Sequence, residues 1–208
     1  MYNEEIIINI PQEETYTSDD FIIGNGILYR CYAKSTVVTI PSDVKKIKKD
    51  AFICIEENGF KHLNDRTRKI VLPNSVIEIE EDAFANLKYL EEINLPNGIT
   101  EIQNALFYNC SNLKEINIPD MVTKIGDNAF SGCQNLKKIN IPDSIEEIGK
   151  NAFHMCMGLG GKNFNFSRSL KKIGENAFWF VGARIAIFAD CECGKDAFLR
   201  CDVVRKEI

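Results

Sequence analysis

The sequence predicts an α/β solenoid, a single elongated stack of short repeated units, and three observations predict it. An 18-residue phrase recurs: residues 116–133 read INIPDMVTKIGDNAFSGC, and residues 139–156 read INIPDSIEEIGKNAFHMC. A phenylalanine recurs at nearly the same period. Within each unit, the apolar residues change from strand-like alternation to helical spacing. Because one such unit cannot bury its own apolar face, the units must stack.

The repeated phenylalanine gives the number and length of the units. It falls at residues 52, 84, 107, 130, 153, 178 and 198, with gaps of 32, 23, 23, 23, 25 and 20 residues. We therefore expect a right-handed solenoid of about seven repeats of about 23 residues, running from residue 37 to residue 208. The first unit carries a nine-residue insertion at 56–64 and the last is shortened. Irregular terminal units are typical of a stack whose ends must be closed to solvent.

Each unit reads as strand, turn and helical turn. In residues 116–119, INIP, the two isoleucines alternate inward and the proline ends the strand. Residues 122–125 give a second extended piece, and Gly126 supplies a turn. Asp127 or Asn128 is then expected to cap a helical turn. The apolar stripe of that turn consists of Ala129, Phe130, Cys133 and Leu136.

Two segments precede the repeats. Residues 1–20 contain Ile8-Asn9-Ile10-Pro11, which matches the repeat strand although no Ala-Phe pair follows it. The next residues, QEETYTSDD, read as a solvated acidic linker, so we expect a partly ordered extra strand here at most. Residues 21–36 read as a β-hairpin that turns at Asn25-Gly26 and caps the solenoid of residues 37–208.

Eight cysteines raise the question of a disulfide framework. Three of them recur at the repeat period, in a slot that Leu87 and Val181 fill in other units, which is typical of a small apolar core position. Cys191, Cys193 and Cys201 cluster near the end without the paired CxxC spacing of a zinc site. We expect reduced core thiols rather than bridges or a metal, and a reducing compartment. The three periodic cysteines are Cys110, Cys133 and Cys156.

Composition and charge restrict the partners. The 208 residues carry a net charge of −5 and no dense lysine or arginine block, which argues against nucleic acid. The apolar run at residues 6–8 is far too short to insert into a membrane, and the start, MYNEE, lacks the features of a secretion signal. As written, the chain is expected in the cytoplasm. The alternative is the cell surface, if the chain is a piece of a longer protein.

The phrase LxxIxIPxxVxxIGxxAFxxC resembles the BspA-like class of leucine-rich repeats over about residues 37–201. Residues 21–41 also resemble the N-terminal hairpin that often precedes such arrays. The resemblance implies a leucine-rich-repeat solenoid, no catalytic residues, no cofactor, and a role in adhesion or protein binding. We therefore expect a non-catalytic module that recognises a protein through its concave sheet. The alternative is a passive structural spacer or array within a larger surface protein.

Aligning the repeat strands places an asparagine column on their outward side. The functional interpretation is a hydrogen-bonding strip for a partner, and the structural alternative is a ladder of amide side chains bonded to one another. The aligned residues are Thr39, Val71, Asn94, Asn117, Asn140, Asn165 and Ala186.

One step before that column lies a row of mixed charge. Mixed signs with no dominant charge fit a protein-binding face better than a phosphate groove, and a merely solvated face is the equal alternative. The row consists of Val37, Lys69, Glu92, Glu115, Lys138, Asn163 and Arg184. Its charged members and the four asparagines are the candidate partner-binding residues.

Aromatic residues and histidines complete the candidates. Trp179, Phe180 and Phe188 fit either an exposed contact patch or core filling near the shortened last unit, and core filling is the expectation. His62 and His154 are the only histidines, and His154 lies two residues from Cys156, so the two side chains would diverge on a helix. No catalytic constellation is visible, and we expect no enzyme.

Overall fold

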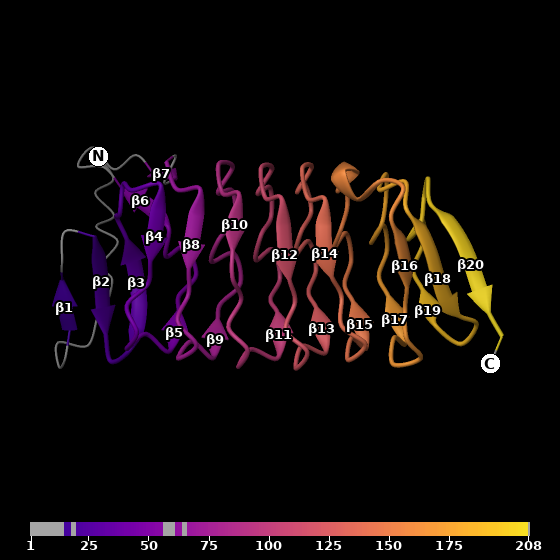
Figure 1. Cartoon of the computed structure of the whole chain (residues 1–208), viewed down its shortest axis with the longest axis horizontal. Coiled ribbons are helices and arrows are strands. Elements are labelled where there is room, and N and C mark those ends of the chain that lie inside the picture. The colour runs from indigo at the N-terminus through magenta and orange to yellow at the C-terminus, as the bar shows by residue number, and fades with distance from the viewer. Residues whose placement is uncertain (1–14, 18–19, 56–60, 64–65, 208) are drawn as a thin grey trace, which may run out of the picture.

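The computed structural model describes residues 15–17, 20–55, 61–63 and 66–207. The chain winds into an elongated stack of coils, which runs in Figure 1 from β1 (Thr15–Thr17) at one end to β20 (Asp202–Lys206) at the other. Each coil contributes short strands to parallel sheets and a run of turns. Among the described residues there is no helix long and apolar enough to cross a membrane.

A five-stranded parallel sheet carries Asn94, Asn117 and Asn140 of the asparagine column and is called the asparagine sheet below. Its strands align in register, with Ile116 beside Ile139 and Asn117 beside Asn140. Consecutive coils therefore place the same side chain of the repeat one strand apart, about 4.8 Å. In order, the strands are β14 (Lys138–Asn140), β12 (Glu115–Asn117), β10 (Glu92–Ile93), β8 (Lys69–Val71) and β4 (Val37–Thr39). A separate parallel sheet of β16 (Asn163–Asn165), β18 (Arg184–Phe188) and β20 follows it along the stack.

The second extended piece of each coil forms another row of parallel strands. Each of these strands has two residues, one charged and one that is buried in all of them except β19, where Cys193 is half-buried, as in the register of Ile125 with Ile148 and Lys124 with Glu147. In order, they are β11 (Glu101–Ile102), β13 (Lys124–Ile125), β15 (Glu147–Ile148), β17 (Lys172–Ile173) and β19 (Glu192–Cys193).

A hairpin closes the N-terminal end of the stack. Strands β2 (Phe21–Gly24) and β3 (Ile27–Cys31) pair antiparallel around Asn25 and Gly26, whose φ angles are 49° and 72°. Strand β1 adds to its outer edge, and β3 pairs parallel with β5 (Lys46–Ile47), which in turn pairs with β9 (Glu78–Ile79). The antiparallel hairpin thus covers the first parallel coil. The repeat-like stretch of residues 8–11 lies outside the described residues.

The inserted segment of the first unit begins and ends in a second small hairpin. Strands β6 (Ile53–Ile55) and β7 (Lys61–Leu63) pair antiparallel, with Cys54 opposite His62. Most of the predicted insertion, residues 56–60 and 64, lies outside the described residues.

The prediction of a helical turn after Gly126 is wrong. The part of the chain that the structure describes contains one 3-10 turn, Met157–Leu159, and no α-helix. Asn128 has φ 56°, a left-handed conformation that cannot continue a right-handed helix. The backbone bonds of this region run between coils instead: the Asn128 N–H donates to Lys150 O (2.8 Å) and the Phe130 N–H to Ala152 O (2.8 Å). The apolar stripe faces the core from a series of turns.

The repeated phenylalanines form one stacked column through the core. The rings of Phe52, Phe84, Phe107, Phe130, Phe153 and Phe178 are at most 1% exposed. Neighbouring centroids lie 5.0–5.5 Å apart, within the range of favourable aromatic contacts. Phe198 continues the column at 6.0 Å from Phe178, half-buried in the last coil. Each coil therefore buries its phenylalanine against those of its neighbours.

The glycine of the repeat is required by close approach rather than by its φ angle. A Cβ atom on Gly149 would lie 2.6 Å from the backbone nitrogen of Asp127, in the preceding coil. Gly126, Gly174 and Gly194 show the same close approach to the coil before them. The turn expected at Gly126 is present, but its glycine is there so that two coils can touch.

We expect Gly149→Ala to lower the free energy of unfolding by about 1–3 kcal/mol, because the methyl group overlaps backbone that cannot retreat without opening the stack. Urea unfolding measures the change. Gly98→Ala is the matched control, since its Cβ would meet the Ile77 side chain at 3.1 Å, and that exposed side chain can rotate away. Equal losses for the two variants would contradict this account.

Candidate functional site on the asparagine sheet

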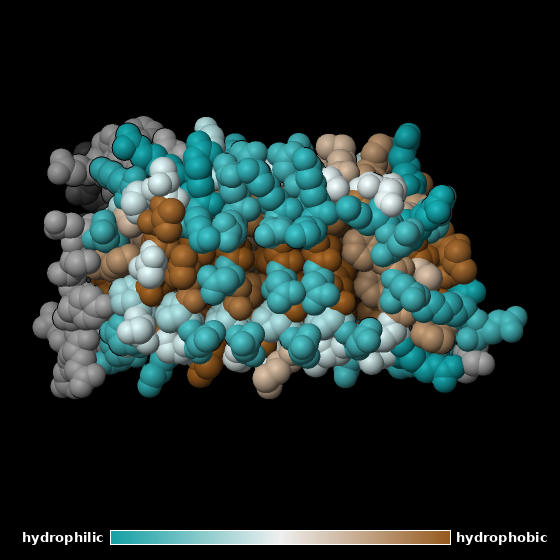
Figure 2. Space-filling view, in the orientation of Figure 1, coloured by the Kyte–Doolittle hydropathy of each residue, from teal (hydrophilic) through white to brown (hydrophobic). Residues whose placement is uncertain are grey.

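The outward side of the asparagine sheet carries an open groove of about 440 Å³. Hydrophilic side chains lie over an apolar floor on this face in Figure 2. The floor consists of the strand isoleucines, and the walls consist of the candidate asparagines and charged residues. The lining residues are Glu92, Ile93, Asn94, Glu115, Ile116, Asn117, Lys138, Ile139 and Asn140.

Asn94 uses its side chain to hold the sheet together. Its amide donates from Nδ2 to Leu72 O (2.9 Å) and accepts at Oδ1 from the Leu72 N–H (3.0 Å). Strand β10 is one residue shorter than β12 and β14, so this side chain takes the place of a backbone ladder contact. Asn94 therefore has a structural role in its own coil.

Asn117 and Asn140 are different. They are adjacent across β12 and β14, both side chains are exposed, and neither forms a side-chain hydrogen bond with any described residue. The predicted amide ladder is therefore absent at these two positions. The pair presents two free amides, each with donors and an acceptor, at the centre of the groove.

Asn165 is exposed but stands apart from this pair. It lies on β16, beside Ala186 of β18, in a sheet that is not hydrogen-bonded to β14. The column of four asparagines predicted from the alignment is thus one structural asparagine, a central free pair and one separated residue.

The charged row is largely neutralised by ion pairs between neighbouring strands. Lys69 Nζ lies 2.6 Å from Glu92 Oε1, and Lys138 Nζ lies 3.1 Å from Glu115 Oε2. Arg184 Nε is 3.8 Å from Asp202 Oδ2 at the far end. These are exposed pairs, each contributing about 0–1 kcal/mol, and they leave little net charge beside the asparagine pair.

Asparagine ladders do occur, on the turn side of the stack, where the sequence alignment did not place them. Asn109 Nδ2 donates to Asn86 Oδ1 (3.1 Å), and Asn151 Nδ2 donates to Asn128 Oδ1 (3.2 Å). All four residues have positive φ, a conformation that asparagine tolerates better than most residues. The signal was present in the sequence at two repeat positions: Asn128 and Asn151 directly precede the Ala-Phe pair, and Asn86 and Asn109 lie two residues after the repeated phenylalanine.

The aromatic residues near the end of the chain are half-buried, so the core filling expected for them is wrong. The Trp179 ring stacks on the His154 ring at 4.7 Å and contacts Phe180 at 4.1 Å, and Arg200 lies 4.4 Å above Phe180. Burial lowers the pKa of His154. The ammonium nitrogen of Lys206 lies over the Phe188 ring, 4.7 Å from the ring centroid.

The periodic cysteines occupy the core as predicted. Cys110, Cys133 and Cys156 are fully buried, and the Cys133 thiol donates to Phe107 O at 3.2 Å. Burial raises the pKa of Cys133 to about 12. Such thiols stay protonated at neutral pH, which makes them poor nucleophiles. Within the described part of the chain, no group of three His, Cys, Asp or Glu side chains is arranged to hold a metal ion.

An ion-pair cluster beside the N-terminal hairpin gives the stack a pH-sensitive contact. Glu80 Oε1 accepts from Lys48 Nζ (2.8 Å) and lies 2.9 Å from Lys46 Nζ, while Oε2 accepts from the Lys49 backbone N–H (3.0 Å). Partial burial alone would raise the pKa of Glu80. The hydrogen bonds from the three lysines outweigh it and lower the pKa from 4.5 to about 2.

A carboxylate whose pKa is lower in the folded chain contributes stability above its unfolded pKa and loses it as the pH falls. We expect the contribution of Glu80 to be complete above about pH 4.5 and lost as the pH falls through about 2. Glu80→Gln should flatten the unfolding free energy in this window. Asp120→Asn, at an exposed carboxylate without an ion pair among the described residues, should not. Identical pH curves for both variants would refute the assignment.

Comparison with known proteins places these features in a family. The family model described as BspA type leucine-rich repeat region matches residues 53–181 in six copies. No characterised protein in the curated set is similar enough in sequence to count as a match.

Among solved structures, a leucine-rich cell surface protein from Faecalibacterium prausnitzii is 30% identical with a TM-score of 0.62. The match covers 71% of this chain but only 38% of the Faecalibacterium protein. The leucine-rich repeat protein of T. pallidum is 26% identical with a TM-score of 0.69, covering 88% of this chain and 85% of its own. The pneumococcal vaccine antigen PcpA, 18% identical with a TM-score of 0.54 over 94% of this chain and 48% of its own, shares the fold. The chain belongs to the BspA-type leucine-rich repeat family.

Proposed function

We propose that this chain is a non-catalytic protein-binding module, and that its partner docks on the asparagine sheet. One observation carries the proposal: two adjacent exposed amides, those of Asn117 and Asn140, lie in a groove of about 440 Å³ without side-chain hydrogen bonds to any described residue. An asparagine that only stabilises the stack bonds to it, as Asn94 does through Leu72. The free pair therefore has hydrogen-bonding capacity for a partner.

The surroundings fit a protein rather than a phosphate-rich ligand. The ion pairs Lys69–Glu92 and Glu115–Lys138 flank the amides and cancel most of the local charge. A partner with exposed backbone or amide groups would gain hydrogen bonds there, and the apolar floor would add contact area. The paired charges at the rim would contribute orientation more than affinity.

We also propose that the chain acts at the cell surface. The Faecalibacterium protein, which is similar to it, is described as a cell surface protein. Labelling intact cells with an antibody against this chain tests the location. Signal only after the cells are permeabilised would overturn it and restore the cytoplasmic expectation.

Binding is tested by capturing proteins from host-matrix and native cell extracts on the immobilised chain. We expect a saturable partner. Asn117→Arg with Asn140→Arg should abolish its capture through steric bulk and charge. The matched control is Asn74→Arg with Asn97→Arg, two exposed asparagines at equivalent positions of neighbouring loops, which should bind normally. Absence of any saturable partner favours a passive spacer, and equal loss in both double variants would place binding elsewhere.

A further inference from the structure

The stack opens at one place on the face of the asparagine sheet. Strands β14 and β16 belong to consecutive coils, yet they lie in different sheets, and no backbone hydrogen bond joins them among the described residues. The same two coils remain bonded elsewhere. Ile148 pairs with Ile173 between β15 and β17, and the Phe153 N–H donates to Ala177 O at 2.8 Å. Only this face of the two coils is split.

Residues of the fifth and sixth units account for the split. The fifth unit is two residues longer than the unit before it, and the 3-10 turn Met157–Leu159 precedes β16. In the sixth unit, Phe164 and Phe166 stand where other units carry Ile, Leu or Val, and their rings each lie 6.0 Å from Phe178. Two phenyl rings need more room than two isoleucine side chains, so the strand that carries them stands away from β14.

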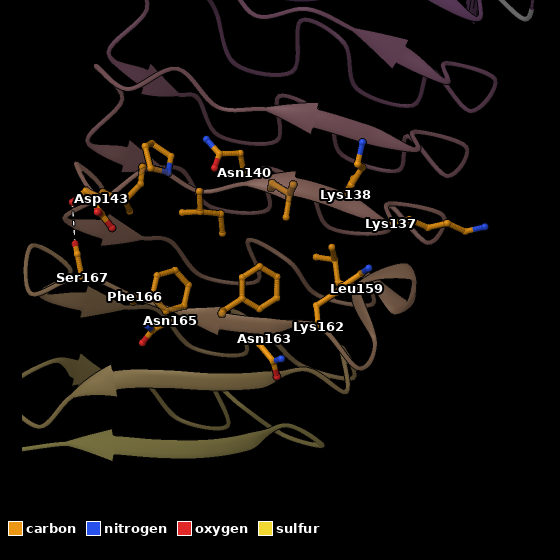
Figure 3. Close-up of a pocket in the computed structure, with 15 residues that line it drawn as sticks. Lys137, Lys138, Asn140, Asp143, Leu159, Lys162, Asn163, Asn165, Phe166 and Ser167 are labelled. Carbon is orange, nitrogen blue, oxygen red and sulfur yellow. Dashed lines mark hydrogen bonds between the residues drawn. The ribbon is translucent and has the colours of Figure 1, made fainter.

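The split leaves an open groove of about 300 Å³, which Figure 3 shows between the two strands. Ile139, Ile141 and Phe164 line it and are only half-buried, whereas Ile116 and Ile118 in the previous coil are at most 4% exposed. The volume lies at the low end of ligand pockets. It suits a few side chains of an extended segment rather than a folded domain.

The groove is also bounded by two strand edges. In a parallel ladder, alternate residues of a strand bond to the same neighbour. Asn140 O accepts from Ile118 on the β12 side, so the backbone groups of Ile139 and Ile141 point toward β16. Lys162 O and the Phe166 N–H bond to the β18 side, so the backbone groups of Asn163 and Asn165 point toward β14. Such unpaired edges are templates for an added strand.

Positive charge gathers at the end of the groove where both strands begin. Lys137 and Lys162 are exposed there, and neither forms an ion pair with a described residue, whereas Lys138 forms an ion pair with Glu115. At the opposite end, Ser167 Oγ donates to Asp143 O (2.8 Å) and ties the coils together (Figure 3). A peptide strand that binds in the groove should therefore carry acidic residues at its N-terminal end, beside the lysines. Its C-terminal end should turn out of the groove, where the Ser167–Asp143 bond closes it.

We propose that the groove takes residues 4–11 of a second copy of this chain as an added parallel strand. This segment reads EEIIINIP, and its Ile8-Asn9-Ile10-Pro11 repeats the Ile139-Asn140-Ile141-Pro142 of β14. In that register, the isoleucines enter the groove and the proline turns the chain out at the tied end. In this register Ile6 aligns with Lys137, and Glu4 and Glu5 lie within two residues of the free lysines.

The segment of the same copy cannot reach. Residue 11 is four Cα–Cα steps from Thr15 of β1, which span at most about 14 Å. Strand β1 is about seven strand positions from β15, or about 34 Å along the stack. Donor and acceptor must therefore be on different copies, a head-to-tail contact that extends past a dimer unless it closes into a ring.

Sedimentation of the full chain over a range of concentrations tests the assembly. We expect concentration-dependent self-association, and we expect the chain lacking residues 1–12 to stay monomeric. A full chain that remains monomeric at all concentrations, or a shortened chain that associates equally well, overturns the proposal. These measurements need no outside partner, so they stand or fall independently of the function proposed above.

A synthetic peptide of residues 3–12 tests the groove itself on the shortened chain. We expect saturable binding, lost when Ile8 and Ile10 of the peptide are replaced by serine. Lys137→Glu with Lys162→Glu should weaken binding about tenfold or more, and a peptide with Glu4→Lys and Glu5→Lys should restore it. Lys88→Glu with Lys195→Glu is the control, at two exposed lysines without ion pairs among the described residues. No peptide binding, or equal loss in both charge reversals, overturns the proposal.

Discussion

Replacing Phe130 with alanine is expected to lower the free energy of unfolding by about 3–5 kcal/mol, the range for a fully buried phenylalanine. The ring is 0% exposed and lies between Phe107 and Phe153, at 5.4 and 5.3 Å. Its removal leaves a cavity that the coils on both sides border. In a linear stack each coil is stabilised by its neighbours, so the loss should spread beyond the mutated unit.

Urea unfolding measures the total effect, and hydrogen exchange of the amides in the flanking coils measures its spread. Met121→Ala is the control, since that side chain is 61% exposed and should change stability by less than about 0.5 kcal/mol. A loss below about 1 kcal/mol for Phe130→Ala would show that the column does not hold the stack together.

Cys133→Asp should cost about 3–5 kcal/mol, because it places an unpaired carboxylate in a fully buried position. Cys133→Val is the matched control and should cost less than about 1.5 kcal/mol. The carbonyl that the thiol contacts, Phe107 O, keeps its bond from the Cys110 N–H at 3.1 Å, so valine leaves no buried acceptor unsatisfied.

Thermal unfolding of both variants measures the difference. Thiol titration adds a second readout: Cys110, Cys133 and Cys156 should be unreactive in the native protein, and all eight cysteines should react in denaturant without reductant. Fewer than eight reactive thiols after unfolding would reveal disulfides. Equal destabilisation by aspartate and valine would show that the position is not a small apolar core site.

Most of the fold could be predicted from the repeat period. Because a 23-residue period determines which residue meets which in the next coil, the stacked Phe column, the buried Cys110 and the adjacency of Asn117 and Asn140 all follow from the sequence. The inward and outward alternation of the strands follows in the same way.

The local conformation of the turns could not be predicted from that pattern. The spacing from Ala129 to Leu136 is helical, but left-handed Asn128 and the backbone bonds to the next coil favour turns. A periodicity shows which side chains face the core and not where the backbone bonds go. Likewise, the two extra residues of the fifth unit were visible, but the opening between β14 and β16 depends on ring volumes in three dimensions.

The candidate site was predicted in part. The alignment found the free pair Asn117 and Asn140, but it could not separate them from Asn94, whose amide bonds to Leu72 because β10 is short. The ion pairs of the charged row depend on which strands are neighbours and which rotamers reach, so from the sequence a row of mixed signs fits a recognition surface and a solvated face equally well. In the structure, ion pairs between neighbouring strands neutralise most of that row.

The central claim is that inward residues hold the stack and the outward asparagine pair is free for recognition. Urea unfolding of Asn117→Arg with Asn140→Arg, measured beside Phe130→Ala, tests it most directly. We expect the double arginine variant to stay within about 1 kcal/mol of the unmodified chain, since exposed side chains without bonds to the stack contribute little to its stability. A loss as large as that of Phe130→Ala would make the pair structural and would contradict the account.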